Sequence, residues 1–240
     1  MERLDKVIAT GCGVSRADAR RLILRSKVTV GGQTVRDIAY KVDPAVDEIC
    51  LNGQAVCYQK YCYLMMHKPA GVLTATEDKR QKTVLDLVPP ELHRRGLYPV
   101  GRLDRDTTGL LLLTNDGDFG HMLLSPNKKI PKQYLVGLDD VVLPHLIERF
   151  AAGLTLADGT KLSAAGLQIS EDPHMALVTI TEGKYHQIKR MFGLFSLGVV
   201  SLKRVSFAGL TLPEDLAEGQ ARPLTASELD CIYHAKKSMF

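Results

Sequence analysis

The apolar positions of residues 1–50 predict a small α/β module. Apolar side chains recur at helical spacing in 4–8 and again in 19–23, which predicts two short helices. Ser15, followed three positions later by an acid, is typical of a capped start for the second helix. Beyond it, a Gly-Gly pair interrupts an alternating stretch over 27–35, and this pattern predicts a β-hairpin.

Strands dominate from Tyr63 onward, and helices are interspersed among them without a regular βα alternation. This mixture predicts an α+β fold with a mixed, mainly antiparallel sheet rather than a doubly wound one. A polar, turn-rich stretch over 52–60 is the candidate linker, so we expect domains at 1–59 and 60–240. The expected strands cover 63–66, 72–75, 110–114, 134–136 and 176–181, and the expected helices cover 141–152, the residues after 185 and those from 225 onward.

The composition is that of a globular protein. Of the 240 residues, 45% are hydrophobic and 24% are charged, which excludes intrinsic disorder and fibrous classes. The longest aliphatic run, Leu110 to Leu113, is far shorter than the roughly 20 residues that span a bilayer. The first six residues include acids and no apolar segment, so we expect no signal peptide, no membrane association and a cytoplasmic location. Five cysteines without a CxxC pair predict reduced thiols and no metal site.

The net charge of +4 is unevenly distributed along the chain. Residues 1–41 contain nine Lys or Arg against four Asp or Glu, and residues 183–204 contain five basic side chains and no acid. Two separated basic patches suggest a polyanion held at two places, although a charge cluster is also typical of a solvated face. Two helices leading into a hairpin, with basic side chains on the second helix, resemble the S4 RNA-binding domain. This resemblance implies RNA contacts by Arg16, Arg20, Arg21, Arg25 and Lys27.

The segment Gly101–Gly109 is the densest in candidate chemistry. Its Gly, Thr, Asp and Arg residues come directly before an aliphatic strand, so a rigid neighbour positions the polar side chains. Asp104 lies between Arg102 and Arg105, and nearby cations favour an ionised carboxylate that can act as a nucleophile or base. By itself, the same pattern also fits a surface loop with an Asp–Arg ion pair.

Four motifs in order resemble those of one enzyme family. Gly101–Leu110 closely resembles the segment around the catalytic aspartate of the RsuA-type pseudouridine synthases. Lys68–Gly71 is similar to the first motif of that family, Lys132–Val136 to its tyrosine motif, and Glu182–Phe192 to its basic motif. Because the family also carries an S4-like module, the resemblance covers nearly the whole chain. One departure is His67, where relatives often have Asn before the Lys-Pro pair.

The resemblance implies that Asp104 is the essential catalytic carboxylate. Tyr134 would stack on the target base, and Leu202 would form part of the pocket wall. Lys189 matches the basic residue that pairs with the aspartate, and Arg190 beside it is an alternative for that role. Without the resemblance, a tyrosine buried in a strand and a basic helix face are the favoured explanations of these residues. The implied substrate-binding residues are Arg102, Tyr134, Lys189, Arg190 and Leu202.

The implied reaction converts uridine to pseudouridine. It breaks the N1–C1′ bond, turns the uracil over and rejoins it through C5, so nothing is oxidised and we expect neither a redox cofactor nor a metal. A base inside a helix is unreachable, and the enzyme must therefore flip it out. Asp104 could attack C1′, add to the uracil ring or remove the 2′ proton, and the sequence leaves all three open.

The subgroup that modifies 16S rRNA resembles this chain most closely, through its opening at 3–6 and the segment Leu124–Pro126. We therefore expect a monomer that isomerises a specific uridine in 16S rRNA or in a small-subunit assembly intermediate. A 23S rRNA enzyme of the sibling subgroup shares the same motifs and is the first alternative. A non-catalytic S4-type protein that binds RNA during ribosome assembly is the second.

Overall fold

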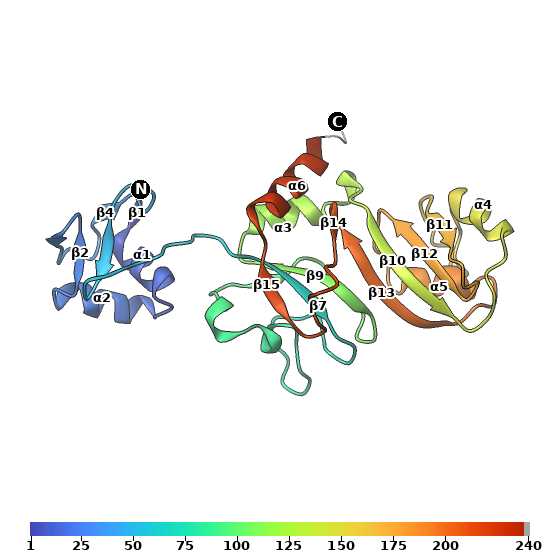
Figure 1. Ribbon diagram of the computed structural model, residues 1–240, viewed down its shortest axis with the longest axis horizontal. Helices are drawn as coiled ribbons and strands as arrows, with labels where there is room; N and C mark the ends of the chain where they lie inside the picture. Colours follow the sequence, from blue (N-terminus) through green and yellow to red (C-terminus); the bar gives the residue numbers. More distant parts are fainter. Residues whose placement is uncertain (238–240) are drawn as a thin grey trace. The chain divides into compact units, whose positions relative to one another are not determined.

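The computed structural model describes the backbone of residues 1–237 and the side chains of residues 1–234. The chain divides into two compact units, Met1–Cys62 and Tyr63–Phe240, which we call unit 1 and unit 2 (Figure 1). Within the described residues, no helix is long and apolar enough to cross a bilayer.

Unit 1 packs two helices, α1 (Leu4–Gly11) and α2 (Arg16–Leu24), against short antiparallel strands. The Ser15 hydroxyl accepts a hydrogen bond of 3.1 Å from the Asp18 amide, which confirms the predicted helix cap. The predicted hairpin is also confirmed, because β2 and β3 pair across the Gly-Gly turn. Its strands are β1 (Glu2–Arg3), β2 (Val28–Val30), β3 (Gln33–Thr34), β4 (Lys41–Val42), β5 (Ile49–Leu51) and β6 (Gln54–Ala55), arranged as a β1-β4 pair and a sheet of order β3-β2-β5-β6.

The stretch predicted as a linker, 52–60, is in large part integral to unit 1. Asn52 and Gly53 both have positive φ and form the tight turn of the β5–β6 hairpin. The Val56 amide then donates a 2.8 Å hydrogen bond to the Ile49 carbonyl, and the Val56 side chain packs on the core of the unit. The linker prediction was wrong here because hairpin turns and linkers share the same polar composition.

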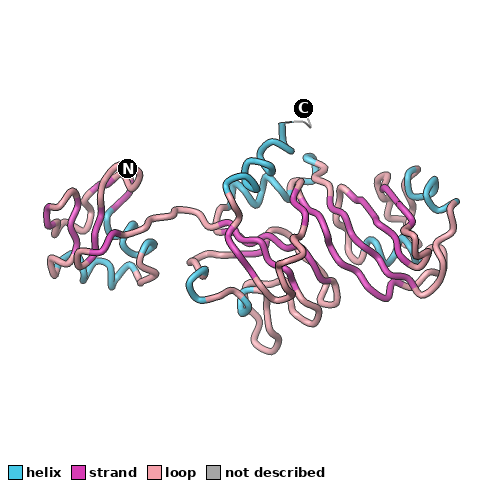
Figure 2. Tube along the Cα trace, viewed as in Figure 1, coloured by secondary structure: helices cyan, strands magenta, loops and turns pink. Residues whose placement is uncertain are grey.

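Unit 2 is built on a mixed, mainly antiparallel sheet of order β11-β12-β10-β13-β9-β7-β15, with β14 added to β13 and β8 to β9 (Figure 2). This arrangement confirms the predicted α+β class. The strands are β7 (Tyr63–Lys68), β8 (Tyr98–Pro99), β9 (Thr108–Thr114), β10 (Lys132–Leu138), β11 (Gly166–Ile169), β12 (Met175–Ile180), β13 (Val199–Phe207), β14 (Leu210–Thr211) and β15 (Ala221–Pro223).

The predicted helices of unit 2 are present, whereas the helix Gly117–Leu124 was not predicted. The helix expected from 141 begins only at His145, directly after Pro144. The strand expected at 72–75 does not form, since only Leu73 makes a single bridge, to Thr83. The α-helices are α3 (Gly117–Leu124), α4 (His145–Ala151), α5 (Gln187–Gly193) and α6 (Ala226–Lys237), and short 3-10 turns lie at Leu85–Leu87, Pro90–Leu92 and Pro126–Lys128.

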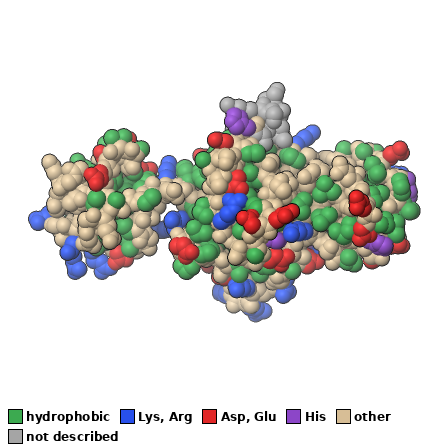
Figure 3. Space-filling model, in the orientation of Figure 1, with side chains coloured by type: hydrophobic (Ala, Val, Ile, Leu, Met, Phe, Trp, Pro, Cys, Tyr) green, Lys and Arg blue, Asp and Glu red, His purple; other side chains and the backbone are tan. Residues whose placement is uncertain are grey.

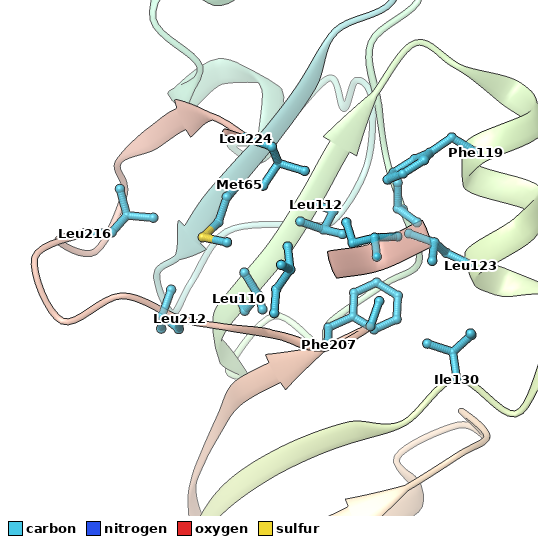
Figure 4. Packing of buried hydrophobic residues seen from close by; sticks show 14 residues of the cluster. Met65, Leu110, Leu112, Phe119, Leu123, Ile130, Phe207, Leu212, Leu216 and Leu224 are labelled. Carbon is cyan, nitrogen blue, oxygen red and sulfur yellow. The ribbon is translucent and has the colours of Figure 1, made fainter. Parts of the chain in front are cut away.

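One core of unit 2 lies over β7, β9 and the end of β13. Met65, Leu110, Leu112 and Phe207 point into it from these strands, and α3 contributes Phe119 (Figure 4). Alternation along β9 places every second leucine in this cluster, as expected for a strand covered on both faces.

The other half of the sheet, which ends at β11, is covered by α4 and α5. Phe150 of α4 and Phe192 of α5 are fully buried, with ring centroids 5.1 Å apart. This packing fixes α5, which carries the basic motif, against the sheet.

The two halves meet where β13 runs beside β9, which is the one parallel strand pair within residues 1–237. Gly109 lies opposite Arg204 at this point and has a φ of 105°. A Cβ at position 109 would overlap the backbone of Arg204, so the approach of the strands requires glycine. The Arg204 side chain is buried and donates from Nε to the Leu110 carbonyl at 2.7 Å, which adds a second link.

We expect Gly109→Ala to lower the free energy of unfolding of unit 2 by roughly 2–6 kcal/mol, because positive φ and overpacking each cost about 1–3 kcal/mol. Urea denaturation measures this loss. Gly193→Ala is the matched control, since nothing lies within 4 Å of a Cβ there. Equal stability of the two variants would show that the strands can separate at no cost.

Candidate active site

The segment that contains Asp104 is held by the chain just after β7. Lys68, at the end of β7, is fully buried, and its Nζ donates to the carbonyl oxygens of Pro69 at 3.0 Å, Arg105 at 3.2 Å and Thr107 at 2.9 Å. Two of these carbonyls flank Asp104 on its carboxyl-terminal side. One ammonium group therefore ties the Asp104 segment to the sheet.

Two further contacts hold the same backbone. The buried Thr74 hydroxyl donates to the Leu103 carbonyl at 2.7 Å and accepts from the Leu103 amide at 3.2 Å. The Gly71 amide donates to the Arg105 carbonyl at 2.8 Å, and Arg105 Nε donates back to the Gly71 carbonyl at 3.2 Å. These contacts thus hold the backbone on both sides of Asp104 in place, and none of them involves the Asp104 side chain.

Burial lowers the pKa of Lys68 to about 8, from an ordinary value of 10.5, although the Asp106 and Asp104 carboxylates act in the opposite direction. The first motif of the sequence contained this lysine, but sequence reasoning assigned it no role. The sequence feature that could have indicated this role is a Lys-Pro pair at the end of an apolar strand. Burial of a charge there is costly unless the fold supplies hydrogen-bond partners.

Asp104 opens into a pocket of about 320 Å³, at the lower end of the range found for ligand sites. Its side chain retains about a third of its exposure, so it lies between bulk water and the protein interior. The pocket is lined by Arg102, Leu103, Asp104, Thr107, Tyr134, Ile180, Gly183, Lys184, Tyr185, His186, Gln187, Ile188 and Leu202.

The sheet brings four predicted site residues into this pocket. Tyr134 on β10 and Leu202 on β13 are both buried and come from neighbouring antiparallel strands, where Leu202 pairs with Val136. They share the pocket with Asp104 and with the exposed Arg102. Because β13 also runs beside β9, strand pairing alone carries the tyrosine to the aspartate segment.

The two basic residues of α5 have other partners than expected. Lys189 Nζ lies 2.7 and 2.6 Å from the two carboxylate oxygens of Asp106, and Arg190 lies 2.5 Å from Asp158. In the described part of the chain neither pairs with Asp104. The prediction of a Lys189–Asp104 pair differs from the structure because Asp104 turns into the pocket, whereas Asp106 extends to α5. The hydrogen bond from Lys189 lowers the pKa of Asp106.

The side chain that lies beside the Asp104 carboxylate instead belongs to a residue to which the sequence analysis gave no role. His186 Nε2 lies 3.7 Å from Asp104 Oδ1. His186 directly precedes α5 and has a left-handed backbone with φ of 48°, a conformation that is uncommon outside glycine. Only its place in the basic motif marked it in the sequence.

The basic side chains predicted to bind RNA in unit 1 divide into two groups. Arg16 and Arg20, together with Arg3, donate to the fully buried Asp5 carboxylate at 2.8–3.2 Å. Burial raises the pKa of Asp5, but the three guanidinium groups outweigh it and hold that pKa far below its usual range. Figure 3 shows Lys and Arg side chains gathered along one edge of this unit. The second group of predicted RNA-binding residues does not contact Asp5. It consists of Arg21, which pairs with Asp18, and of the exposed Arg25 and Lys27.

Comparison with known proteins places this arrangement in a family. Residues 62–193 match the family of RNA pseudouridylate synthases, and residues 2–54 match the S4 domain. The chain is 42% identical over 230 residues to the "Uncharacterized RNA pseudouridine synthase YtzG" of Bacillus subtilis strain 168, covering 95% of this chain and 96% of that protein. It is 41% identical over 228 residues to ribosomal small subunit pseudouridine synthase A of Escherichia coli K12, covering 95% and 98%.

A crystal structure of a pseudouridylate synthase is similar to this fold, with a TM-score of 0.67 and 34% identity over 97% of this chain and 100% of that one. The chain therefore belongs to the RNA pseudouridylate synthase family and carries an S4 domain. The predicted family and enzyme class are confirmed. The roles of individual side chains stay predictions, because the family match assigns none of them.

We expect Lys68→Met to reduce kcat by up to about 100-fold with a smaller change in KM, because loss of the ammonium frees the backbone beside Asp104. Release of tritium from [5-³H]uridine-labelled RNA measures the rate. Lys79→Met, at an exposed lysine, is the matched control. A fall in both variants, or in neither, would contradict the positioning role.

The same variant tests the lowered pKa of Lys68. Because its pKa is about 8 in the folded chain and 10.5 ordinarily, the unfolded state binds more protons between these values. Stability of the wild type is therefore expected to rise with pH from about 8 to 10.5, relative to Lys68→Met. Urea denaturation at each pH measures the free energy of unfolding. If this free energy changes with pH in the same way in both proteins, the pKa of Lys68 is not lowered.

Proposed function

We propose that this enzyme converts one uridine of small-subunit ribosomal RNA, 16S rRNA in bacteria, to pseudouridine. The observation that carries the proposal is the pocket in which Asp104 meets Tyr134 and Leu202. The target is supported by similarity over 95% of the chain to proteins named ribosomal small subunit pseudouridine synthase A.

The proposed mechanism begins with extrusion of the uridine from its RNA stack, at a cost of a few kcal/mol. Tyr134 stacks on the extruded base and Leu202 closes the pocket wall, which returns about 1–3 kcal/mol. Asp104 then acts on the nucleoside as an ionised carboxylate, at C1′, on the uracil ring or on the 2′ proton. The base turns over within the pocket and rejoins the sugar through C5. All three routes need a charged carboxylate at this position.

Cations around the pocket hold the RNA and the Asp104 segment. Arg102 is exposed at the pocket and is suited to a phosphate of the bound RNA. Of the two candidates on α5, we assign the supporting cation to Lys189, because it binds Asp106 two residues from Asp104. Arg190 binds Asp158, in a different loop, and so holds α5 in place.

Unit 1 supplies sequence-independent affinity in this proposal. Arg16, Arg20, Arg21, Arg25 and Lys27 offer guanidinium and ammonium groups to RNA phosphates. We also propose that the enzyme acts in the cytoplasm, where ribosomal RNA is assembled, and that it acts as a monomer on rRNA or on a small-subunit assembly intermediate.

Mapping pseudouridines in ribosomal RNA from cells with and without the gene tests the function. We expect one small-subunit site to disappear and to return with the wild type but not with Asp104→Asn. The Asn variant removes the charge needed by every route, and we expect it still to bind the RNA. Asp140→Asn, at an exposed carboxylate, should restore the site fully.

Two results would overturn the proposal. Loss of a large-subunit site would transfer the enzyme to another ribosomal target. Full restoration of the site by Asp104→Asn would remove the carboxylate from the reaction.

The RNA-binding role of unit 1 has its own test. Arg25→Gln combined with Lys27→Gln should weaken RNA binding and reduce the slope of log K against log salt by about 1–2, since each lost phosphate contact lowers it by about 1. Filter binding over a salt series measures the slope. Lys41→Gln, an exposed lysine on β4, is the control. A larger effect from this control would place the RNA on another face of the unit.

A further inference from the structure

Two aromatic rings stack on each other at the Asp104 pocket. The rings of Tyr185 and His186 lie 3.9 Å apart between centroids, with 17° between their planes. Both residues line the same pocket as Asp104 and Tyr134. His186 therefore lies beside the Asp104 carboxylate, with its Nε2 3.7 Å from Oδ1, and Tyr185 is stacked on the imidazole ring.

Exposure separates Tyr185 from the tyrosine already placed in the mechanism. Tyr134 is 7% exposed, whereas Tyr185 is 75% exposed. A single exposed apolar residue is common on any protein surface and means little alone. Here, however, the exposed ring is stacked, lies at a pocket built for a nucleoside, and leaves most of its surface to solvent.

The loop that carries these rings is held rigidly. The buried Gln187 accepts a hydrogen bond from the Lys184 amide at 2.9 Å and donates from Nε2 to Glu182 at 3.1 Å. Its own amide donates to the Lys184 carbonyl at 3.2 Å. The left-handed backbone of His186 persists within this frame, although it costs about 1–2 kcal/mol. A stacking surface held in advance loses little entropy on binding.

We propose that the Tyr185–His186 pair binds the nucleobase next to the target uridine, by stacking of that base on the exposed face of Tyr185. This inference rests on the proposed function and extends it from one bound nucleotide to two. Extrusion of the target removes a stacking partner from its neighbours in the RNA. An aromatic ring at the pocket replaces that partner, while Tyr134 holds the target itself at the buried end.

The chemistry of the surroundings favours RNA as the occupant. Lys184 and Arg102 line the same pocket and are exposed, so they lie where the phosphates that flank an extruded nucleotide need cations. Stacking on tyrosine accepts any base, since every base has a π face. The surface therefore selects an unstacked nucleotide rather than a particular sequence.

The experiment uses the full-length enzyme and a short small-subunit rRNA hairpin that contains the mapped target. Tyr185→Ala should weaken binding about 5- to 140-fold, the range of loss for one stacked base. Tyr185→Phe keeps the ring and should retain most of the affinity. Val200→Ala, an exposed apolar residue on β13 outside the pocket, is the control for surface truncation.

Abasic RNA separates stacking from a purely structural role of the tyrosine. Removal of one flanking base, on the 5′ or the 3′ side, should weaken wild-type binding by as much as Tyr185→Ala does. The alanine variant should then be insensitive to that same removal. The proposal would be overturned if the affinity loss from Tyr185→Ala multiplied with the loss from base removal at both the 5′ and the 3′ flank. It would also be overturned if Tyr185→Ala left the affinity unchanged.

Failure of this inference is distinguishable from failure of the proposed function. If the wild type modifies a large-subunit hairpin instead, the ribosomal target is wrong, and the same variants and abasic positions on that hairpin decide the stacking. The other outcome is that the wild type modifies the small-subunit hairpin while the affinity losses from Tyr185→Ala and from the abasic position multiply. In that case the proposed function is supported and the proposed site for the second base is wrong.

Discussion

The Asp104 pocket depends on one buried ammonium group. Lys68 is taken out of water at a cost of several kcal/mol, and three backbone carbonyls compensate by accepting its hydrogen bonds. Hydrogen bonds to a charged donor contribute about 1.5–3 kcal/mol each, so the arrangement is stable only when all three carbonyls are in place. This makes the conformation of the Asp104 segment and the burial of Lys68 a single requirement.

Strand pairing supplies the other half of the pocket. The parallel contact of β13 with β9 joins two antiparallel halves of the sheet, and Gly109 allows the close approach. Across this join, β10 and β13 present Tyr134 and Leu202 to a carboxylate from the loop that precedes β9. Each contributing side chain lies on or beside a regular element, which limits its freedom before RNA binds.

Charge is distributed differently in the two units. In unit 1, three arginines share one buried carboxylate, and each guanidinium keeps between about a third and a half of its exposure. In unit 2, Lys189 and Arg190 are each paired with an exposed carboxylate, which leaves Asp104 beside His186. The first arrangement leaves partly exposed guanidinium groups at the surface of unit 1, whereas the second links α5 to the loops around the Asp104 pocket.

Much of this organisation could be predicted from the sequence because it is local. The Ser15 cap, the Gly-Gly hairpin, the apolar strand at β9 and the polar segment before it all follow from nearest-neighbour geometry. The tertiary structure alone decided that Lys189 pairs with Asp106, that Lys68 holds the Asp104 backbone and that His186 faces the carboxylate. These choices join residues 37 to 83 positions apart, and they depend on which rotamers and carbonyls the packed sheet leaves within reach.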